Sequence, residues 1–264
     1  MWYLFLILAI SSTLGIPVNE DESGKRGKRY RKFEGDMMLT EAQIRAAENG
    51  LDPTNQGRAR GLTRRGQWPG GVVPYTIHSS AKNKFLNKLG IKGLTERAIY
   101  SAMKEWKEKT CIRFVPRTTQ KNYVEFFKGD GCWSHVGCLK NGKQRISIGS
   151  FCWFHGIVVH EIGHALGFWH EQSRPDRDNY VEIVWKNIKK EKKHNFKKYG
   201  HGSIDSLGVP YDYGSIMHYG KRAFAKWPWQ TTIRPKKKGV SIGQRKRLSP
   251  LDVKQMNLYY NCKK

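Results

Sequence analysis

The chain has 264 residues, of which 38% are hydrophobic and nine are tryptophan. This is enough apolar material for the core of one large domain or two small ones, so the composition excludes a disordered polymer. Lysines and arginines number 48 against 22 aspartates and glutamates, and the net charge of +26 predicts salt-sensitive attraction to polyanions. No nucleic-acid recognition motif is present, so nucleic acid is not an expected partner.

The chain opens with a short apolar run. Residues 1–10 are apolar, and the small residues among 11–15 suit cleavage by signal peptidase. A membrane-spanning helix needs about 20 apolar residues, and neither this run nor any later one is long enough. We therefore expect residues 1–15 to be a secretory signal and the protein to be secreted and extracellular, where an oxidising environment suits its five cysteines.

Residues 16–58 differ in character from the rest of the chain. They carry the basic run 25–32 and few large apolar residues, so they cannot fold alone, although residues 40–49 are helix-like. Residues 1–58 contain eight basic and eight acidic side chains, so the whole charge of +26 lies in the remainder. We expect this charge to bind a polyanionic extracellular surface. The alternative is that the basic runs only form a solvated face of the protein. The basic runs in question are residues 186–198, 236–238 and 245–247.

From residue 59 onward the pattern predicts both strands and helices. Short apolar or β-branched runs indicate strands at 72–77, 112–117, 123–127 and 146–150. A helix is predicted between the first two, with Thr95 as its N-cap. Its buried face consists of Ala98, Ile99, Ala102, Met103 and Trp106.

The chain after residue 170 is less regular. A basic stretch reaches residue 199, and glycine-rich connections follow through residue 220. A last helix is predicted to start at Ser249, where Asp252 completes a capping-box-like pair, and to end near residue 260. The elements together predict an α+β fold.

The strongest functional motif is His-Glu-x-x-His, followed by a third histidine. On a helix, His160 and His164 project from the same face and lie within reach of one metal ion. Gly167 suits the left-handed end of such a helix, so the chain can turn back and His170 can complete the set. Three imidazoles leave one position of Zn²⁺ open for a water whose pKa falls to about 7, and Glu161 can take its proton.

Chance occurrence on an ordinary amphipathic helix is the alternative for the five-residue motif alone. The longer pattern argues against it. Residues 156–159 are apolar, as a buried active-site helix requires, and the glycine and the third histidine follow at a workable spacing.

Residues 160–171 resemble the extended zinc motif of the metzincin metalloproteases, and within them that of the astacin family, and residues 172–180 are similar to its continuation. Residues 215–219, Ser-Ile-Met-His-Tyr, resemble the methionine turn of the family. The resemblance implies a two-lobed protease domain with a twisted mixed sheet, an active-site helix and an irregular C-terminal lobe. It also implies that Met217 is an apolar floor beneath the zinc and that Tyr219 is a further ligand. Tyr219 then leaves the metal when substrate binds and donates a hydrogen bond to the oxyanion. The alternatives are core filling for Met217, which holds in either case, and a buried phenol with a satisfied hydroxyl for Tyr219.

Residues 33–37, Phe-Glu-Gly-Asp-Met, resemble the motif by which astacin propeptides hold an aspartate against the zinc. Asp36 is therefore the candidate latency switch, because a carboxylate oxygen is a competent zinc ligand that displaces the water. The alternative is a simple Gly-Asp turn before the helix-like segment.

The resemblance places the mature N-terminus near Ala59, after Arg58, where a trypsin-like activating protease can cut. Arg60 and the pair at 64–65 are rival cleavage sites. The expected division is therefore a signal peptide at 1–15, a propeptide at 16–58 and a catalytic domain at 59–264. The freed ammonium is expected to interact with Glu171.

Four of the five cysteines are paired by the same resemblance, Cys111 with Cys262 and Cys132 with Cys152. Cys138 is left over. It is a buried thiol, an alternative partner for Cys132 or Cys152, or an intermolecular link, and we favour the buried thiol.

The function predicted from the sequence is that of a secreted zinc metalloendopeptidase, made as a latent precursor, that hydrolyses extracellular proteins. Arg245 is a hypothetical determinant of preference for acidic residues after the scissile bond. The alternative function is a secreted basic protein that binds polyanions on a protease scaffold.

Overall fold

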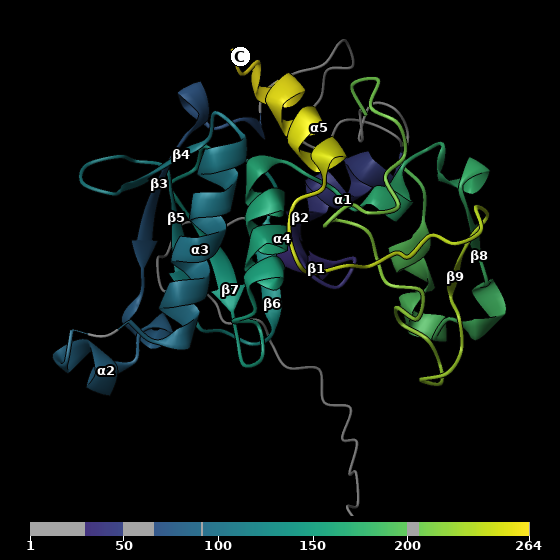
Figure 1. The fold of residues 1–264 in the computed structure, drawn as a ribbon, viewed down its shortest axis with the longest axis horizontal. Coiled ribbons are helices and arrows are strands. Elements are labelled where there is room, and N and C mark those ends of the chain that lie inside the picture. Colours follow the sequence, from purple (N-terminus) through teal and green to yellow (C-terminus); the bar gives the residue numbers. More distant parts are fainter. Residues whose placement is uncertain (1–29, 50–65, 91, 200–205, 264) are drawn as a thin grey trace, which may run out of the picture.

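The structure is a computed structural model that describes residues 30–49, 66–90, 92–199 and 206–263. Its largest element is a mixed sheet of seven strands in the order β1-β2-β6-β7-β5-β3-β4 (Figure 1). Strands β4, β3, β5 and β7 run parallel to one another, whereas β6 is antiparallel to β7. The strands are β1 Tyr30–Phe33, β2 Met37–Thr40, β3 Val72–Ile77, β4 Arg113–Pro116, β5 Tyr123–Phe127, β6 Cys132–His135 and β7 Lys143–Ile148.

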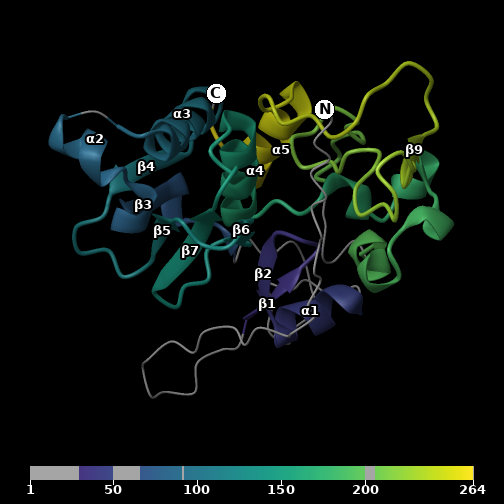
Figure 2. The ribbon, with the colours of Figure 1, turned by 90° about the horizontal axis from the view of Figure 1, so that it is seen from below.

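Helices α3 and α4 lie side by side on one face of this sheet (Figures 1 and 2). The main core fills the space between them, where Trp106 of α3 and Ile162 of α4 are fully buried with Phe126 of β5. The nitrogen of the Trp106 ring donates to the carbonyl of Val159 at 3.1 Å, so the two helices are joined by a polar contact as well. The helices are α1 Glu41–Glu48, α2 Lys84–Lys88, α3 Leu94–Lys109, α4 His155–Leu166 and α5 Pro250–Tyr260.

The part of the chain after α4 forms a second, irregular lobe, on the right in Figure 1. Its regular elements are the short antiparallel strands β8 Val181–Ile183 and β9 Ile233–Pro235 and several short 3₁₀ helices. The 3₁₀ turns of the described residues are Pro69–Gly71, Ser79–Ala81, Glu171–Ser173, Arg177–Asn179, Trp185–Asn187 and Lys190–Phe196. The predicted α+β architecture, with a mixed sheet, an active-site helix and an irregular second lobe, is confirmed.

The segment of residues 30–49 forms a hairpin followed by helix α1, and it lies between the two lobes (Figure 2). Strand β2 extends the main sheet by pairing in parallel with β6, so that Met37 lies opposite Ser134. The segment has a small core of its own, in which Met37, Leu39 and Ile44 are buried. Because this core also includes Val136 and Tyr199, the segment needs the rest of the chain to bury its apolar side chains.

Most predicted elements are present, and the structure adds strands β1, β2, β8 and β9 and helix α2, which were not predicted. Helix α3 begins at Leu94 with Gly93 as its N-cap, so the prediction that Thr95 caps it was wrong. A Cβ on Gly93 would lie 3.0 Å from the Cβ of Asn83, so close packing favours glycine there. The strand predicted at 146–150 is shifted to Lys143–Ile148, and strand β6 was not predicted. The capping box of Ser249 and Asp252 at α5 is confirmed.

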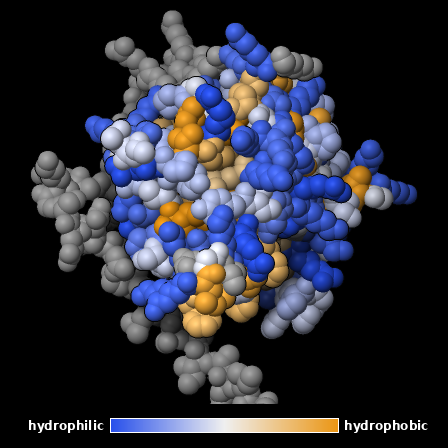
Figure 3. All heavy atoms as spheres, turned by 60° about the vertical axis from the view of Figure 1, so that its left-hand side comes forward, coloured by the Kyte–Doolittle hydropathy of each residue, from blue (hydrophilic) through white to orange (hydrophobic). Residues whose placement is uncertain are grey.

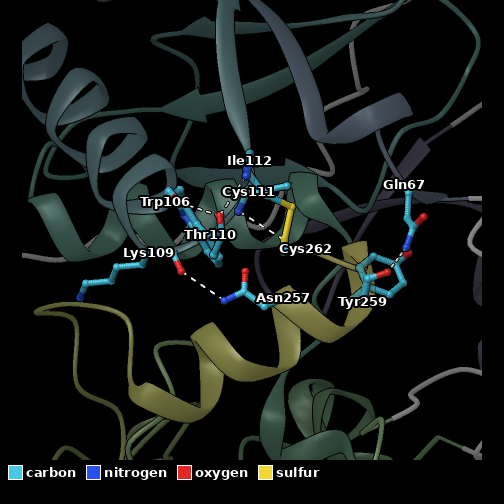
Figure 4. Close-up of a disulfide and its surroundings, with 9 residues drawn as sticks. All are labelled: Gln67, Trp106, Lys109, Thr110, Cys111, Ile112, Asn257, Tyr259 and Cys262. Atoms are coloured by element: carbon cyan, nitrogen blue, oxygen red, sulfur yellow. Dashed lines mark hydrogen bonds between the residues drawn. A yellow bond between two sulfur atoms is a disulfide. The ribbon is translucent and has the colours of Figure 1, made fainter. Parts of the chain in front are cut away.

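Two disulfides join the chain as the resemblance implied. Cys111 is bonded to Cys262 across 151 residues, which ties the end of α5 to the start of β4 (Figure 4). Closing a loop of this length in the unfolded chain corresponds to about 5 kcal/mol of stability. Cys132 is bonded to Cys152, and Cys138 is a buried free thiol, as favoured.

Hydrophilic residues dominate the face shown in Figure 3, and the hydrophobic residues on it form small separate groups. The described part of the chain contains no helix that combines the length and the apolar character needed to cross a bilayer. Residues 1–15 and the cleavage sites proposed between 58 and 65 lie outside the described residues.

Candidate active site

Helix α4 carries the first two histidines and the glutamate of the motif on a buried surface. It ends at Gly167, whose φ of +117° is left-handed, and the amide of Gly167 bonds back to the carbonyl of His164 at 2.8 Å. A Cβ at this position would lie 3.0 Å from the ring of Tyr259. Both the backbone angle and the packing therefore require glycine. The chain then turns back and brings His170 to the same point, as predicted.

The three histidines converge on the carboxylate of Asp36, which comes from the hairpin of β1 and β2. Its oxygens lie 3.1 Å from Nε2 of His160, 3.1 Å from Nε2 of His170 and 3.6 Å from Nε2 of His164. One ligand atom from each of these four residues lies within 4.8 Å of all the others. The structure thus brings together the three predicted zinc ligands and the predicted latency switch.

These four residues fit a zinc ion, because several of their buried nitrogen and oxygen atoms have no hydrogen-bond partner. Oδ1 of Asp36 and Nε2 of His164 and His170 are buried and have no hydrogen-bond partner. Buried polar atoms are normally paired, so a cluster of unpaired nitrogen and oxygen atoms is suited to hold a cation. Burial lowers the pKa of His160 to about 3 and also lowers that of His164, which keeps both imidazoles neutral as metal ligands must be.

The other nitrogen of each histidine has a partner that fixes the ring. Nδ1 of His160 donates to the carbonyl of Ile216 at 2.8 Å, and Nδ1 of His164 donates to the carbonyl of Phe168 at 2.8 Å. Nδ1 of His170 instead contacts a carboxylate oxygen of Glu34 at 2.7 Å. Burial opposes protonation of His170, but Asp36 and Glu34 outweigh it and raise its pKa to about 9 in the absence of a metal. In all three rings Nε2 faces the site.

Glu161 lies beside the ligands without being one of them. Its side chain is 1% exposed, and its Oε2 has no hydrogen-bond partner. Burial, and next the charge of Asp36, raise the pKa of this carboxyl well above its usual range. An unpaired carboxyl oxygen beside the ligands is a group that can exchange a proton with a reacting molecule.

Residues 215–219 form the floor of the site. Met217 is buried, and a Cβ on Gly163 of α4 would lie 2.9 Å from its sulfur, so the methionine packs directly against the active-site helix. Tyr219 lies next to the third histidine, with ring centroids 4.5 Å apart, and its hydroxyl donates to the backbone carbonyl of Glu34. Met217 therefore packs beneath the active-site helix, while the hydroxyl of Tyr219 is engaged by Glu34. The roles of both residues at the metal stay predictions.

Asp252 holds this floor in position, a role that was missed when only its helix cap was predicted. Its carboxylate accepts from Ser215 Oγ at 2.7 Å and from the amide of Ile216 at 2.9 Å, as well as from Ser249 at the start of α5. Glu34 was also missed as a functional residue. The only sequence signal for it was its place inside the motif at 33–37.

Glu171 is buried one residue beyond the third histidine. Its carboxylate accepts from Arg174 at 3.1 Å and from the amide of Asp212 at 2.8 Å, while burial raises its pKa to about 8. The N-terminus expected to pair with it, near Ala59, lies outside the described residues.

Arg245 is half-buried close to the site. Its guanidinium donates to the carbonyl of His218 at 3.0 Å, and its charge lowers the pKa of Glu161 against the larger effect of burial. A Cβ on Gly156 would clash with the carbonyl of Arg245, so the start of α4 packs tightly against this segment.

A helix-borne His-Glu-x-x-His pair, a third histidine after a glycine turn and a methionine beneath them define the class of zinc peptidases. Residues 62–261 match the peptidase family described as Astacin, and the chain belongs to this family.

Relatives and solved structures agree with the family assignment. The chain is 43% identical over 241 residues to Blastula protease 10 of Paracentrotus lividus, covering 87% of this chain and 38% of that protein. It is 40% identical over 272 residues to Meprin A subunit beta of Homo sapiens, covering 99% of this chain and 35% of that protein. The solved structure of High choriolytic enzyme 1, a hatching enzyme zinc-protease from Oryzias latipes, matches with a TM-score of 0.68 and 38% identity, covering 78% of this chain and 99% of that chain. The chain thus spans less than two fifths of the length of these two curated relatives.

Proposed function

We propose that this protein is a secreted zinc metalloendopeptidase that is made as a latent precursor and hydrolyses peptide bonds of extracellular proteins. The observation that carries the proposal is the convergence of three buried imidazole nitrogens on Asp36, which belongs to the segment expected to be a propeptide. The residues proposed to hold Zn²⁺ are His160, His164 and His170. Membership of a zinc peptidase family supports this assignment.

When bound, Zn²⁺ supplies a lowered pKa for a water molecule and polarisation of the scissile carbonyl. Glu161 takes the proton of the attacking water, because its carboxylate is next to the ligands and has a free oxygen. It can then deliver that proton to the leaving amine. The hydroxyl of Tyr219 donates a hydrogen bond to the developing oxyanion once it no longer donates to the carbonyl of Glu34. Met217 supplies no chemistry and keeps the floor apolar.

Latency follows from the position of residues 30–49. Asp36 occupies the point on which the histidines converge, and strand β2 lies along the edge of β6. A peptide substrate therefore meets a filled site until this segment is removed. We propose that a trypsin-like protease removes it by cutting at Arg58, with the rival sites as alternatives.

Casein hydrolysis with and without a chelator tests the proposed function. The uncleaved protein is expected to be inactive, and brief treatment with trypsin followed by trypsin inhibition is expected to produce activity. Excess chelator should abolish the activity, and stoichiometric Zn²⁺ added after the chelator has been removed should restore it, because three neutral imidazoles bind zinc reversibly. Activity that survives complete removal of the metal contradicts the proposal.

Arg245 is proposed to favour substrates with an acidic residue after the scissile bond. Replacing it by alanine is expected to lower kcat/KM for peptides with Asp at that position by about tenfold or more, since loss of a partly buried charge partner costs about 2 kcal/mol. Peptides with Ala at that position should lose much less activity, because for them only the effect of the Arg245 charge on Glu161 is lost. Paired peptide assays measure this, with R247A as the control because Arg247 is a nearby exposed cation. Equal effects on both peptides would remove Arg245 from specificity.

A polyanionic extracellular polymer is proposed as a further partner, and the distribution of charge supports it. Residues 213–251 contain ten lysines or arginines and no acidic residue, and residues 183–204 contain seven against the single Glu191. Backbone hydrogen bonds lay these two segments against each other, because Lys226 donates to Asn187 at 2.8 Å and Lys189 donates to Phe224 at 3.1 Å. Cations from both segments therefore share one surface.

Two exposed aromatic rings adjoin this surface. Trp227 and Trp229 are 56% and 69% exposed, and their rings are stacked with centroids 5.6 Å apart. Flat apolar faces beside a row of cations suit a sulfated polysaccharide, which offers both sugar rings and anions.

Elution from immobilised heparin tests this partner. A variant in which Lys189, Lys190, Lys192 and Lys193 become glutamine is expected to elute at clearly lower salt than the wild type. The control changes Lys82, Lys84, Lys88 and Lys107, which removes the same charge from exposed positions of the other lobe. Equal elution of the two variants would show that net charge alone causes the binding.

A further inference from the structure

Glu34 is buried among the groups that surround the third histidine. Its side chain is 0% exposed, and one carboxylate oxygen lies 2.7 Å from Nδ1 of His170. The other oxygen accepts from Ser173 Oγ at 2.9 Å and from the hydroxyl of Tyr199. Every one of these partners lies in residues 170–199, so the carboxylate is held entirely by the catalytic part of the chain.

The third histidine differs in this respect from the other two. His160 and His164 donate their Nδ1 protons to the backbone carbonyls of Ile216 and Phe168, which belong to the catalytic part itself. Those two contacts remain after residues 30–49 have been cut away. The partner of His170 is the only one of the three that leaves with the segment.

The backbone around Glu34 is shaped to deliver this carboxylate. Glu34 has a φ of +50°, a left-handed conformation that is unfavourable for a residue with a side chain, and Gly35 follows with a φ of +93°. A Cβ on Gly35 would lie 2.8 Å from the ring of Phe224, so no side chain fits there. The buried hydrogen bonds of Glu34 offset the cost of its backbone conformation.

We propose that Glu34 is a positioning residue for His170, through which the uncleaved precursor retains its zinc ion more firmly than the histidines and Asp36 alone would allow. A carboxylate on the far nitrogen of a ligating imidazole fixes its orientation and raises its basicity. Cleavage of the propeptide then removes one ligand and also the partner of another. This inference rests on the proposed zinc site and on the proposed role of residues 16–58.

The rate of zinc release from the uncleaved chain tests the inference without any measurement of catalysis. Protein loaded with Zn²⁺ is mixed with excess chelator, and the release is followed with a zinc-sensitive dye. E34A is expected to release zinc about 10- to 100-fold faster than the wild type, the range typical for loss of such an outer partner. E34Q, which keeps the shape but not the charge, should be intermediate. E41Q is the control, because Glu41 is an exposed acid of the same segment.

A second measurement separates this role from loss of Asp36. E34Q is assayed for peptide hydrolysis before cleavage, and it is expected to stay latent while it releases zinc faster. Release at the wild-type rate in both Glu34 variants overturns the inference. So does acceleration confined to variants that have lost latency, because that acceleration is due to Asp36. A wild-type chain that binds no zinc contradicts the proposed function instead.

Discussion

Replacing Glu161 by glutamine is expected to lower kcat of the trypsin-processed protein by about 10²- to 10⁴-fold, the usual contribution of a general base. Glutamine keeps the shape of the side chain but cannot accept the proton of the attacking water. Because Glu161 is not among the four clustered ligand residues, zinc content should stay at one ion per chain. Peptide hydrolysis and elemental analysis of the same preparation measure both quantities.

E182Q is the matched control for this substitution. Glu182 is exposed and paired with Arg234 on the second lobe, so the same chemical change there should leave kcat unaltered. The E161Q variant also separates the two functions considered from the sequence, because an enzyme with this substitution loses hydrolysis and keeps heparin binding. A wild-type protein with no hydrolysis to lose would favour the polyanion-binding alternative. A Glu161 variant with full activity would show that another group takes the proton.

The zinc site could be predicted from the sequence because its geometry is set almost entirely by local spacing. His160 and His164 are fixed by the period of one helix, and Gly167 needs only its own left-handed backbone to end that helix. The position of His170 then follows within three residues.

Interactions between distant residues could not be predicted in the same way. Glu34 meets His170 across 136 residues, and Asp252 meets Ser215 across 37. Nothing in the composition near Glu34 distinguishes a buried acid from an exposed one. The disulfides join residues that are 151 and 20 positions apart, and they were implied by the resemblance rather than by any local pattern.

Local propensity also failed where packing decided the outcome. Thr95 has the side chain of a good N-cap, yet the helix begins two residues earlier. Its N-cap is Gly93, where the close approach of Asn83 favours glycine. Strand β6 is short and contains Cys132, Trp133, Ser134 and His135, which give little alternation of apolar and polar residues. It becomes a strand because β7 and β2 pair with it on either side. Register of this kind is a tertiary property.

Replacing Asp36 by alanine is expected to raise the hydrolytic activity of the uncleaved chain on the order of 10²-fold. Loss of one partner from a buried, charged contact costs about 2 to 5 kcal/mol, and each 1.4 kcal/mol changes the ratio of docked to undocked segment about tenfold. Peptide hydrolysis by protein that has not met trypsin measures this, with the chain length checked by mass spectrometry. D130A is the control, because Asp130 is an exposed acid in the loop before β6.

The activity of the uncleaved Asp36 variant is expected to stay below that of the processed enzyme. The alanine removes the carboxylate but leaves the amide of Ser134 bonded to the carbonyl of residue 36 at 2.8 Å, and leaves β2 paired with β6. Glu34 also remains anchored beside His170. If the uncleaved variant is as inactive as the wild type, these contacts alone block the site and Asp36 is not the switch. If it is as active as the processed enzyme, the strand pairing contributes nothing to latency. We expect an intermediate activity, because β2 and Glu34 still hold the segment. Adding E34A to the same chain should raise this activity further.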